Sequence, residues 1–354
     1  MNNSIKVGLL NDLASTPPSP SDLESWLQRV ADDYWAAGRL PAPVQFINGW
    51  GLGLPEGSAA NVLAAYQQLV AEPVVMVVGP AIGDNALAVT PLVTELQVPT
   101  INWAGSERAR SEWMFQLQIG SHEDESILLA RFLEQQQARS VAVVYDQSPI
   151  GDGYRHFFLA EANRLGCSPR LQLGVPPVAE ALAEDAFVAL ASTPVDAVVY
   201  LGLGHVLPTL ALALAGAQFS GLTLATSAGI RGYQPGVGAA LEGWIYADLV
   251  SEHNSTLVAY RQRLNLPARQ SLAAAKGYDM GRLVMEGLAR APALTPAGVR
   301  QGLELIKWLP ASLGEEGTLL GFGQWQRGAL QGRYLVLRQW LAGDSCLLKY
   351  SSGN

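Results

Sequence analysis

Short runs of apolar, often β-branched residues recur along this chain, and longer amphipathic stretches separate them. Strands that are apolar throughout are buried on both faces, which is typical of a parallel sheet covered by helices. The first third predicts strands at 5–10, 43–48, 74–79 and 99–104, with helices at 21–37, 57–71 and 85–95. This pattern predicts a doubly wound α/β lobe.

The same alternation restarts near residue 121 and predicts a second lobe of similar size. Its predicted strands are 140–146, 170–175, 196–202, 222–227 and 243–248. Its predicted helices are 121–137, 152–165, 179–191 and one that ends at Phe219. The length of 354 residues is too great for one ordinary core and fits two.

The last hundred residues predict helices at 254–263, 271–290 and 296–308, then a β-hairpin at 332–350 with its turn near Gly343–Asp344. A helical block after the second sheet has little reason to form its own domain. We therefore expect it to cover the first lobe and the hairpin to return to the second. The predicted lobes are 1–120 plus 252–325 and 121–251 plus 326–354, with crossovers near 118–122, 247–252 and 322–331.

Composition excludes several classes of protein. A net charge of -8 leaves no basic stripe for nucleic acid, and no apolar run reaches the length of a membrane span. The four histidines lack metal-ligand spacing. Cys167 and Cys346 are too few for a disulfide scaffold or a metal cluster, and whether they pair is open. We expect no metal and no cofactor.

The start, "MNNSIKVGLL", lacks a basic region followed by a long apolar segment and a cleavage site. Two alternatives follow. Either the protein stays in the cytoplasm, or a signal peptide was removed and replaced by Met1.

The stretch "FINGWGLGLPEGSAAN" (46–61) places a glycine-dense turn between a strand and a helix, a layout that is used to bind phosphates. Its glycines do not give G-x-G-x-x-G, so a flexible connection is the better interpretation. Small or polar residues also follow each of the remaining predicted strands. Because ligands bind outside the carboxyl ends of parallel strands, and small residues let the backbone approach them, we expect two sheet edges that face one cleft.

Signals of catalysis are weak. The chain has no G-x-S-x-G, so Ser106 and Ser227 are interpreted as loop hydroxyls. The acidic run "HEDE" (122–125) fits a helix first turn, where the macrodipole favours carboxylates. Trp103 either stacks on a ligand or packs at the sheet edge, and His205 either faces the cleft or is an ordinary loop residue. The other tryptophans considered are interpreted as core residues: Trp26, Trp35, Trp308 and Trp340.

The order and spacing of several segments resemble one family. They are "IKVGLL", "VVGPAIGDNALAVTPLVTELQVPTINWAGS" (77–106), "SVAVVYDQSPIGDGYRHFF" (140–158), "DAVVYLGLG" (196–204) and "GTLLGFGQWQRGALQGRYLVLRQW" (317–340). Together they resemble the type I periplasmic solute-binding proteins of ABC transporters, in the branch for branched-chain amino acids and amides. The resemblance implies two doubly wound parallel-sheet lobes, a three-segment hinge and a cleft that closes on a small ligand.

The resemblance also implies site residues. In the first lobe, Gly83–Asp84 and Gly105–Ser106 stand where backbone N–H groups and a hydroxyl bind a ligand carboxylate, although Asp84 is equally interpreted as a helix N-cap.

The second lobe departs from the family. Ile150 replaces one aromatic residue, Gly204 or His205 another, and Ala228 stands at the place of the acid that pairs with a ligand ammonium. An ammonium without a counter-charge is costly to bury, so a carboxylate, an amide or an aromatic acid fits better, with Trp103 and Tyr278 as stacking partners.

The resulting hypothesis is a non-enzymatic binding protein that delivers its ligand to an ABC permease, as a monomer or weak dimer without a nucleic-acid partner. The alternatives are a cytoplasmic sensor that signals to a regulatory protein and, less favoured, an α/β enzyme.

Overall fold

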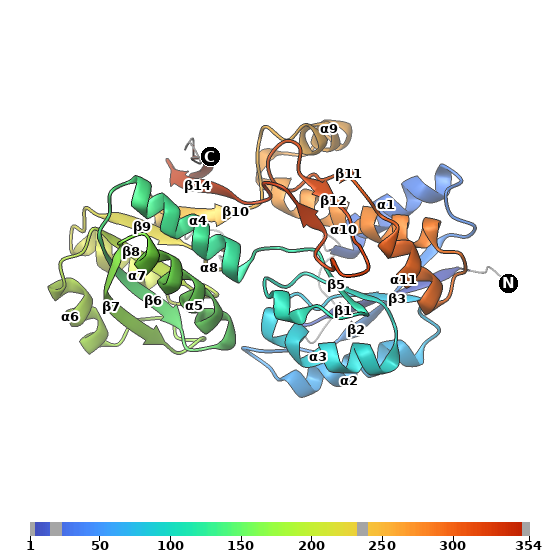
Figure 1. Cartoon of the computed structure of the whole chain (residues 1–354), viewed down its shortest axis with the longest axis horizontal. Coiled ribbons are helices and arrows are strands. Elements are labelled where there is room, and N and C mark those ends of the chain that lie inside the picture. The colour runs from blue at the N-terminus through green and yellow to red at the C-terminus, as the bar shows by residue number, and fades with distance from the viewer. Residues whose placement is uncertain (1–3, 15–22, 232–239, 349–354) are drawn as a thin grey trace. The chain divides into compact units, whose positions relative to one another are not determined.

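The computed structural model describes residues 4–14, 23–231 and 240–348, and the chain divides into two compact units (Figure 1). The first unit comprises Met1–Ile119 and Leu249–Tyr334, and the second comprises Gly120–Asp248 and Leu335–Asn354. Segment 322–331 therefore belongs to the first unit. Each unit contains its own parallel sheet, which confirms the predicted α/β class.

The first unit is built on a five-stranded sheet in which every neighbouring pair is parallel. Its spatial order is β2 (Val44–Trp50), β1 (Ile5–Asn11), β3 (Met76–Val78), β4 (Thr100–Asn102) and β5 (Met114–Gln116). Strand β5 was not predicted, because three residues without a β-branched side chain give no strand signal. Burial of Met114 and Phe115, both fully enclosed, stabilises it.

Helices cover both faces of this sheet. They are α1 (Leu23–Ala36), α2 (Ala59–Ala71), α3 (Gly83–Leu96), α9 (Ser255–Leu264), α10 (Ser271–Arg290) and α11 (Pro296–Glu304), with the short 3-10 helices η1 (Glu107–Ala109) and η3 (Ala268–Gln270). Helices α2 and α3 lie on one face, and α1 and α10 on the other (Figure 1). A Cβ on Gly277 would lie 2.3 Å from the Cβ of Trp26, so this glycine permits the close packing of α10 on α1.

A small antiparallel sheet completes the first unit. It consists of β11 (Leu309–Pro310), β12 (Leu319–Leu320) and β13 (Leu330–Gln331). Trp308 precedes it and is 76% exposed, and Trp35 at the end of α1 is 45% exposed. The prediction that these two tryptophans are core residues is wrong, because Trp35 lies at the end of α1 and Trp308 in the connection between α11 and β11, and both side chains remain exposed there.

The second unit contains a seven-stranded sheet. Its spatial order is β15 (Asp344–Leu347), β14 (Val336–Leu341), β10 (Ile245–Asp248), β9 (Leu222–Ala225), β8 (Ala197–Leu201), β6 (Ser140–Asp146) and β7 (Ser168–Val175). The five strands from β10 to β7 are parallel and repeat the order of the first unit. The predicted hairpin is β14–β15, which pairs antiparallel with β10.

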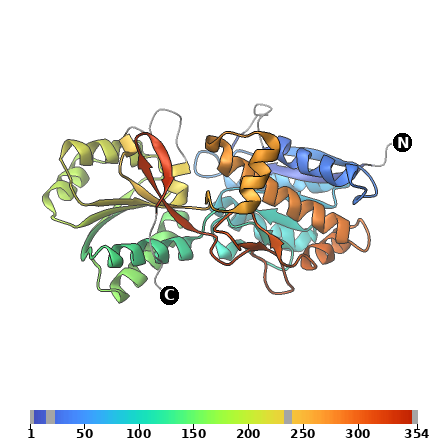
Figure 2. The same ribbon diagram turned by 90° about the horizontal axis from the view of Figure 1, so that it is seen from above.

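Helices lie on both faces of the second sheet, as Figure 2 shows. They are α4 (His122–Gln135), α5 (Pro149–Arg164), α6 (Glu184–Ser192), α7 (Leu207–Gly216) and α8 (Ser227–Arg231). Helix α5 begins three residues before its predicted start, because the Ser148 hydroxyl accepts the Gly151 N–H and caps it. The five-residue α8 was not predicted and contains Ser227, which is therefore not a loop residue.

Candidate functional site

A buried aspartate lies at the point of the first sheet where the strand order reverses, between β1 and β3. Asp12 follows β1 and is 2% exposed. Its carboxylate accepts hydrogen bonds from the backbone N–H groups of Ala81 (2.8 Å) and Ile82 (3.0 Å) and from Asn85 Nδ2 (2.8 Å). Burial raises the pKa of Asp12 despite these bonds. Asp12 thus occupies the donors that an anionic ligand would otherwise use at this point.

The glycine-rich loop after β2 packs against the same group. The Gly53 N–H donates to the Asp12 backbone carbonyl at 2.9 Å, and the Leu54 N–H donates to Asn85 Oδ1 at 2.9 Å. A Cβ on Gly53 would lie 2.2 Å from Asn85 Nδ2. A Cβ on Gly57 would lie 2.1 Å from the Leu52 carbonyl oxygen. These glycines therefore let the loop pack on its own chain, and their spacing forms no phosphate cradle.

The N-terminus of α3 begins directly after the donors that Asp12 occupies. Gly83 is the first residue of the helix and is buried, and the preceding Ile82 offers no side-chain cap. Asp84 lies inside the first turn, so the interpretation of Asp84 as the N-cap is wrong. Its Oδ1 atom is buried and has no hydrogen-bond partner among the described residues. Burial raises the pKa of Asp84 to about 6.

The loop after β4 packs on this helix start. The Trp103 N–H donates to the Pro80 carbonyl at 3.0 Å, and Ala104 packs against Ala86 of α3. Trp103 is 6% exposed, as expected for packing at the sheet edge. The half-buried Gly105 follows, and then Ser106, which is 6% exposed.

The backbone carbonyl of Ser106 stabilises its loop, and its hydroxyl does not cap the 3-10 helix η1 that follows. Its carbonyl accepts hydrogen bonds from Gln116 Nε2 at 3.0 Å and from the Ala109 N–H at 3.1 Å. Ser106 stands at the N-cap position of η1, yet its hydroxyl makes no cap hydrogen bond. The structure thus brings together Gly83, Asp84, Trp103, Gly105 and Ser106 at one edge of the first sheet.

The predicted stacking residue Tyr278 is engaged elsewhere. Its ring stacks on Tyr260 of α9, with centroids 3.8 Å apart and planes 12° apart, and the Arg282 guanidinium lies 4.3 Å from its centroid. The side chain of α10 that reaches Trp103 is Lys276, whose Nζ lies 5.9 Å from the ring centroid. Residues two positions apart on a helix point to different sides, and this periodicity was the signal that sequence reasoning missed.

In the second unit, Asp146 is the last residue of β6 and repeats the role of Asp12. Its carboxylate accepts hydrogen bonds from Tyr200 Oη and the Leu203 N–H, both at 2.6 Å. Burial raises the pKa of Asp146, against the lowering by these bonds and by the charge of the half-buried His205.

Gly204 lies in the same β8–α7 loop. It has φ +97°, and a Cβ there would lie 2.0 Å from the Gly229 carbonyl oxygen. Gly204 thus leaves no room for the aromatic residue of the family, and of the two predicted positions only His205 carries a side chain.

Glu125 of the "HEDE" run is fully buried and anchors α8. Its carboxylate accepts hydrogen bonds from the Ser227 hydroxyl (2.6 Å) and N–H (2.7 Å), and from the Ser121 N–H (2.9 Å). Tyr154 Oη donates to it at 3.3 Å. The macrodipole therefore explains only part of this run.

Two further predicted residues of the second unit lie in the first turns of helices. Ala228 follows Ser227 in α8 and is half-buried. Ile150, in the first turn of α5, is buried.

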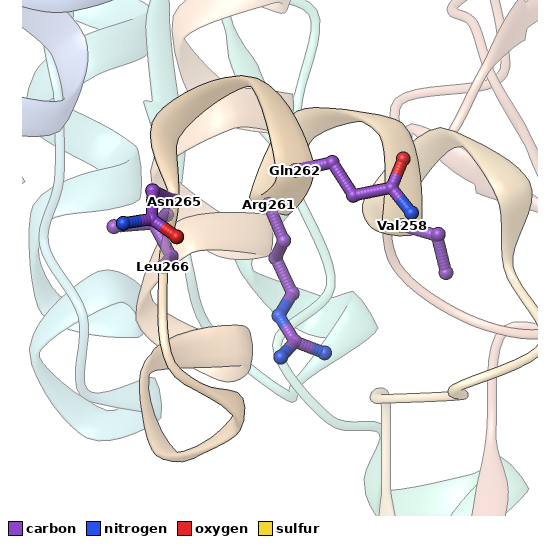
Figure 3. A pocket seen from close by; sticks show the side chains of 5 residues that line it. All are labelled: Val258, Arg261, Gln262, Asn265 and Leu266. Atoms are coloured by element: carbon purple, nitrogen blue, oxygen red, sulfur yellow. The ribbon is translucent and has the colours of Figure 1, made fainter.

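Other features of the described chain give no binding site of the predicted kind. A hollow of about 250 Å³ at the end of α9 is lined by Val258, Arg261, Gln262, Asn265 and Leu266 (Figure 3). It contains none of the predicted site residues. Among the described residues, no three His, Cys, Asp or Glu side chains gather as a metal site. Cys167 is buried, Cys346 is exposed, and both are free thiols.

The chain resembles known proteins in sequence and in fold. Residues 55–333 match the family model described as "Periplasmic binding protein". The chain belongs to this family. No curated protein sequence matches the chain significantly.

Solved structures share the fold of this periplasmic binding protein at low identity. One is a periplasmic binding protein type 1 from Bordetella pertussis Tohama I (16% identity, TM-score 0.81, covering 98% of this chain and 100% of that one). Another is a leucine-binding protein from Thermotoga maritima MSB8 (14%, TM-score 0.78, covering 98% of each chain). A third is an ABC transporter substrate-binding protein from Desulfitobacterium hafniense in complex with Leu (15%, TM-score 0.77, covering 98% and 100%). The resemblance to type I periplasmic binding proteins is thus confirmed.

The helices of this binding protein give no candidate for a membrane span within the described residues.

Proposed function

We propose that this protein is the substrate-binding component of an ABC uptake transporter and binds a small carboxylate, amide or aromatic acid without chemical change. One observation carries the proposal. The start of α3 and Ser106 lie beside Trp103; Ile82 makes no side-chain cap to α3, and the Ser106 hydroxyl makes none to η1. Helix N-termini favour negative charge and offer unpaired N–H donors, so this edge suits a carboxylate or amide oxygen.

The second unit favours a ligand without an ammonium group. Ala228 has no charge, and two buried carboxylates of this unit, Glu125 of α4 and Asp146 of β6, accept hydrogen bonds from their own chain. An ammonium buried at Ala228 would lack the carboxylate that an acidic residue at this position supplies, and an unpaired buried ion costs several kcal/mol, on the order of the penalty for one desolvated ion. The Desulfitobacterium hafniense structure is a complex with Leu, and we propose that Ala228 sets this chain apart from such an amino-acid site.

We further propose that the ligand contacts both units and stabilises a closed arrangement of them. A ligand that makes more contacts in one state shifts the population toward that state. The closed form would dock on a permease, with the protein outside the cytoplasm after removal of a signal peptide. We expect a monomer or a weak dimer and no catalytic activity.

The test is calorimetry with leucine, its keto acid 4-methyl-2-oxopentanoate and the matching amide, on the unmodified protein and on Ser106→Ala. We expect the keto acid or the amide to bind better than leucine. Loss of the hydroxyl should weaken binding by about 1 kcal/mol, the usual worth of one hydrogen bond.

The matched control is Ser58→Ala. Ser58 caps α2 by accepting the Asn61 N–H, so its loss should lower stability and leave affinity unchanged. Tight leucine binding with no binding of the analogues would refute the ligand class, because the ammonium would then have a partner that we have not identified.

A further inference from the structure

We propose that Glu125 of α4 is a positioning residue for the predicted ligand-binding edge of the second unit, and that it couples this edge to the crossover by which the chain enters the unit. The inference rests on the proposed function, because it takes Ile150 and Ala228 as ligand contacts. Glu125 acts through the residues that its carboxylate holds.

The carboxylate of Glu125 joins three parts of the second unit. The residue is fully buried in the first turn of α4. Its Oε1 atom accepts hydrogen bonds from the Ser121 N–H at 2.9 Å and from the Ser227 hydroxyl at 2.6 Å. Tyr154 Oη donates to the same oxygen at 3.3 Å, and the Ser227 N–H donates to Oε2 at 2.7 Å. Because a carboxylate accepts at both oxygens, one side chain holds all three parts together.

The first of these parts is the crossover. The first unit ends at Ile119 and the second begins at Gly120, so Ser121 is the second residue of the second unit. The Ser121 hydroxyl caps α4 by accepting the Asp124 N–H at 3.0 Å. Its N–H donates to Glu125, so the carboxylate is bonded to the chain directly after the boundary between the units.

The second part is α8, which carries Ala228. Ser227 is the first residue of this helix, and two hydrogen bonds tie it to Glu125. On another side α8 packs on the β8–α7 loop, because a Cβ on Gly204 would lie 2.0 Å from the Gly229 carbonyl oxygen. A helix of five residues is marginal by itself, so contacts of this kind decide where Ala228 lies.

The third part is α5, which carries Ile150. Tyr154 stands four positions after Ile150, so the two lie on the same side of α5, and both are buried. The Tyr154 ring lies 4.5 Å from the ring of His122, the first residue of α4. Glu125 and His122 therefore hold α5 by the side on which Ile150 stands.

These contacts give a short physical connection between the predicted edge and the crossover. Only the carboxylate of Glu125 lies between Ser227, the neighbour of Ala228, and Ser121. Energetic coupling needs such a contiguous connection, and it has the same size in both directions. A ligand that orders α8 should therefore also order the chain at Ser121.

Hydrogen–deuterium exchange of the unligated protein tests this connection without a ligand. Ser227→Ala removes one hydrogen bond to Glu125. The matched control is Ser126→Ala, which removes a buried hydroxyl of α4 that donates to the Tyr154 carbonyl. We expect Ser227→Ala to speed exchange at Ser121 by about threefold or more, and Ser126→Ala to leave it within about 1.5-fold. Unchanged or slower exchange at Ser121 in Ser227→Ala would overturn the inference.

Affinity tests the positioning role. Glu125→Gln keeps the size of the side chain and replaces one acceptor oxygen by an NH2 donor. The control is Glu286→Gln, because Glu286 is a buried carboxylate of the first unit that Tyr34 and Arg39 hold outside the candidate site. Calorimetry gives dissociation constants for 4-methyl-2-oxopentanoate, its amide and leucine. For the probe that binds the unmodified protein best, we expect a loss of about tenfold in Glu125→Gln and less than about twofold in Glu286→Gln.

The other outcomes are separable. Unchanged affinity in Glu125→Gln, or equal losses in Glu125→Gln and Glu286→Gln, would overturn the inference and leave the proposed function standing. If Glu125→Gln does not fold, Ser227→Ala and Ser126→Ala replace the pair, and equal affinities of these two variants overturn the inference. If no probe binds the unmodified protein, the proposed ligand class is wrong, and the exchange at Ser121 decides the inference by itself.

Discussion

The two units repeat one strand order, and in each a buried aspartate lies at the carboxyl end of the first strand, just after β1 in one and as the last residue of β6 in the other. In the first unit, Asp12 binds the loop after the third strand, and in the second unit Asp146 does the same. Both sheets therefore fill their own switch point with a carboxylate, where many open α/β sheets bind a ligand.

The units differ in the next loops along the sheet. The starts of α3 and of its counterpart α7 both lack a side-chain cap, so the difference lies after the fourth strand. In the first unit, the Ser106 hydroxyl makes no cap to η1. In the second, the Ser227 hydroxyl donates to Glu125 and so holds α8 to the start of α4.

This comparison indicates a division of labour. We propose that the first unit supplies most of the polar contacts to the ligand, and that Ile150 and Ala228 of the second unit supply apolar ones. A repeated fold therefore does not imply a repeated binding chemistry, because the side chains at equivalent edges decide it.

The largest expected effect tests the common feature. Asp12→Ala and Asp146→Ala should each lower the free energy of unfolding by about 3 kcal/mol, because each strands buried N–H or O–H donors. Urea unfolding measures the loss. The exposed Asp32→Ala is the control and should change stability by less than about 0.5 kcal/mol. If only one of the two substitutions lowered the free energy of unfolding by less than about 1 kcal/mol, Asp12 and Asp146 would not have equivalent roles.

A smaller effect distinguishes the second unit from the first by the pH dependence of its stability. Burial lowers the pKa of His122, in the second unit, to about 4. The unfolded chain then binds more protons than the folded chain between pH 6.5 and 4, so stability is lost as the pH falls through this window. We expect a loss of about 2 kcal/mol between about pH 7 and pH 5, which His122→Phe should remove.

The control for His122 is the exposed loop residue His253, whose replacement by Gln should leave the pH profile unchanged. A wild-type-like loss of stability in His122→Phe would show that another group is responsible.

The smallest effect has the opposite sign and lies in the first unit. The folded pKa of Asp84 is raised to about 6, so the folded chain binds more protons between about pH 6 and 3.8, and stability falls as the pH rises through this window. Asp84→Asn should therefore stabilise the protein at pH 7 by about 1 kcal/mol, after allowance for its partial exposure. Thermal unfolding at pH 7 and pH 4 measures the gain, which should vanish at the lower pH.

Asp152, in the first turn of α5, is the matching exposed acid of the second unit. Asp152→Asn should not stabilise the protein at either pH. A gain equal to that of Asp84→Asn would mean that general charge reduction, rather than burial of Asp84, is the cause.

The sequence by itself determined the class of fold and most of its elements. Helix α10 spans Ser271–Arg290 as predicted, and the hairpin turns at Ala342–Gly343, next to its predicted position. These features follow from local periodicity and turn chemistry, which neighbouring residues encode. The missed elements β5 and α8 are short, and their stability comes from contacts rather than from propensity.

Tertiary structure alone decided which polar groups remain for a ligand. Glu125 and Ser227 are 102 positions apart, and Asp12 and Ala81 are 69 apart, so no local pattern shows that these pairs bind each other. The sequence predicted Tyr278 beside Trp103, and the structure places Lys276 there instead. This outcome depends in the same way on the packing of α10 against α1. A hydrogen bond or cation–π contact requires a separation of a few ångströms, and only the folded backbone brings residues so distant in sequence that close.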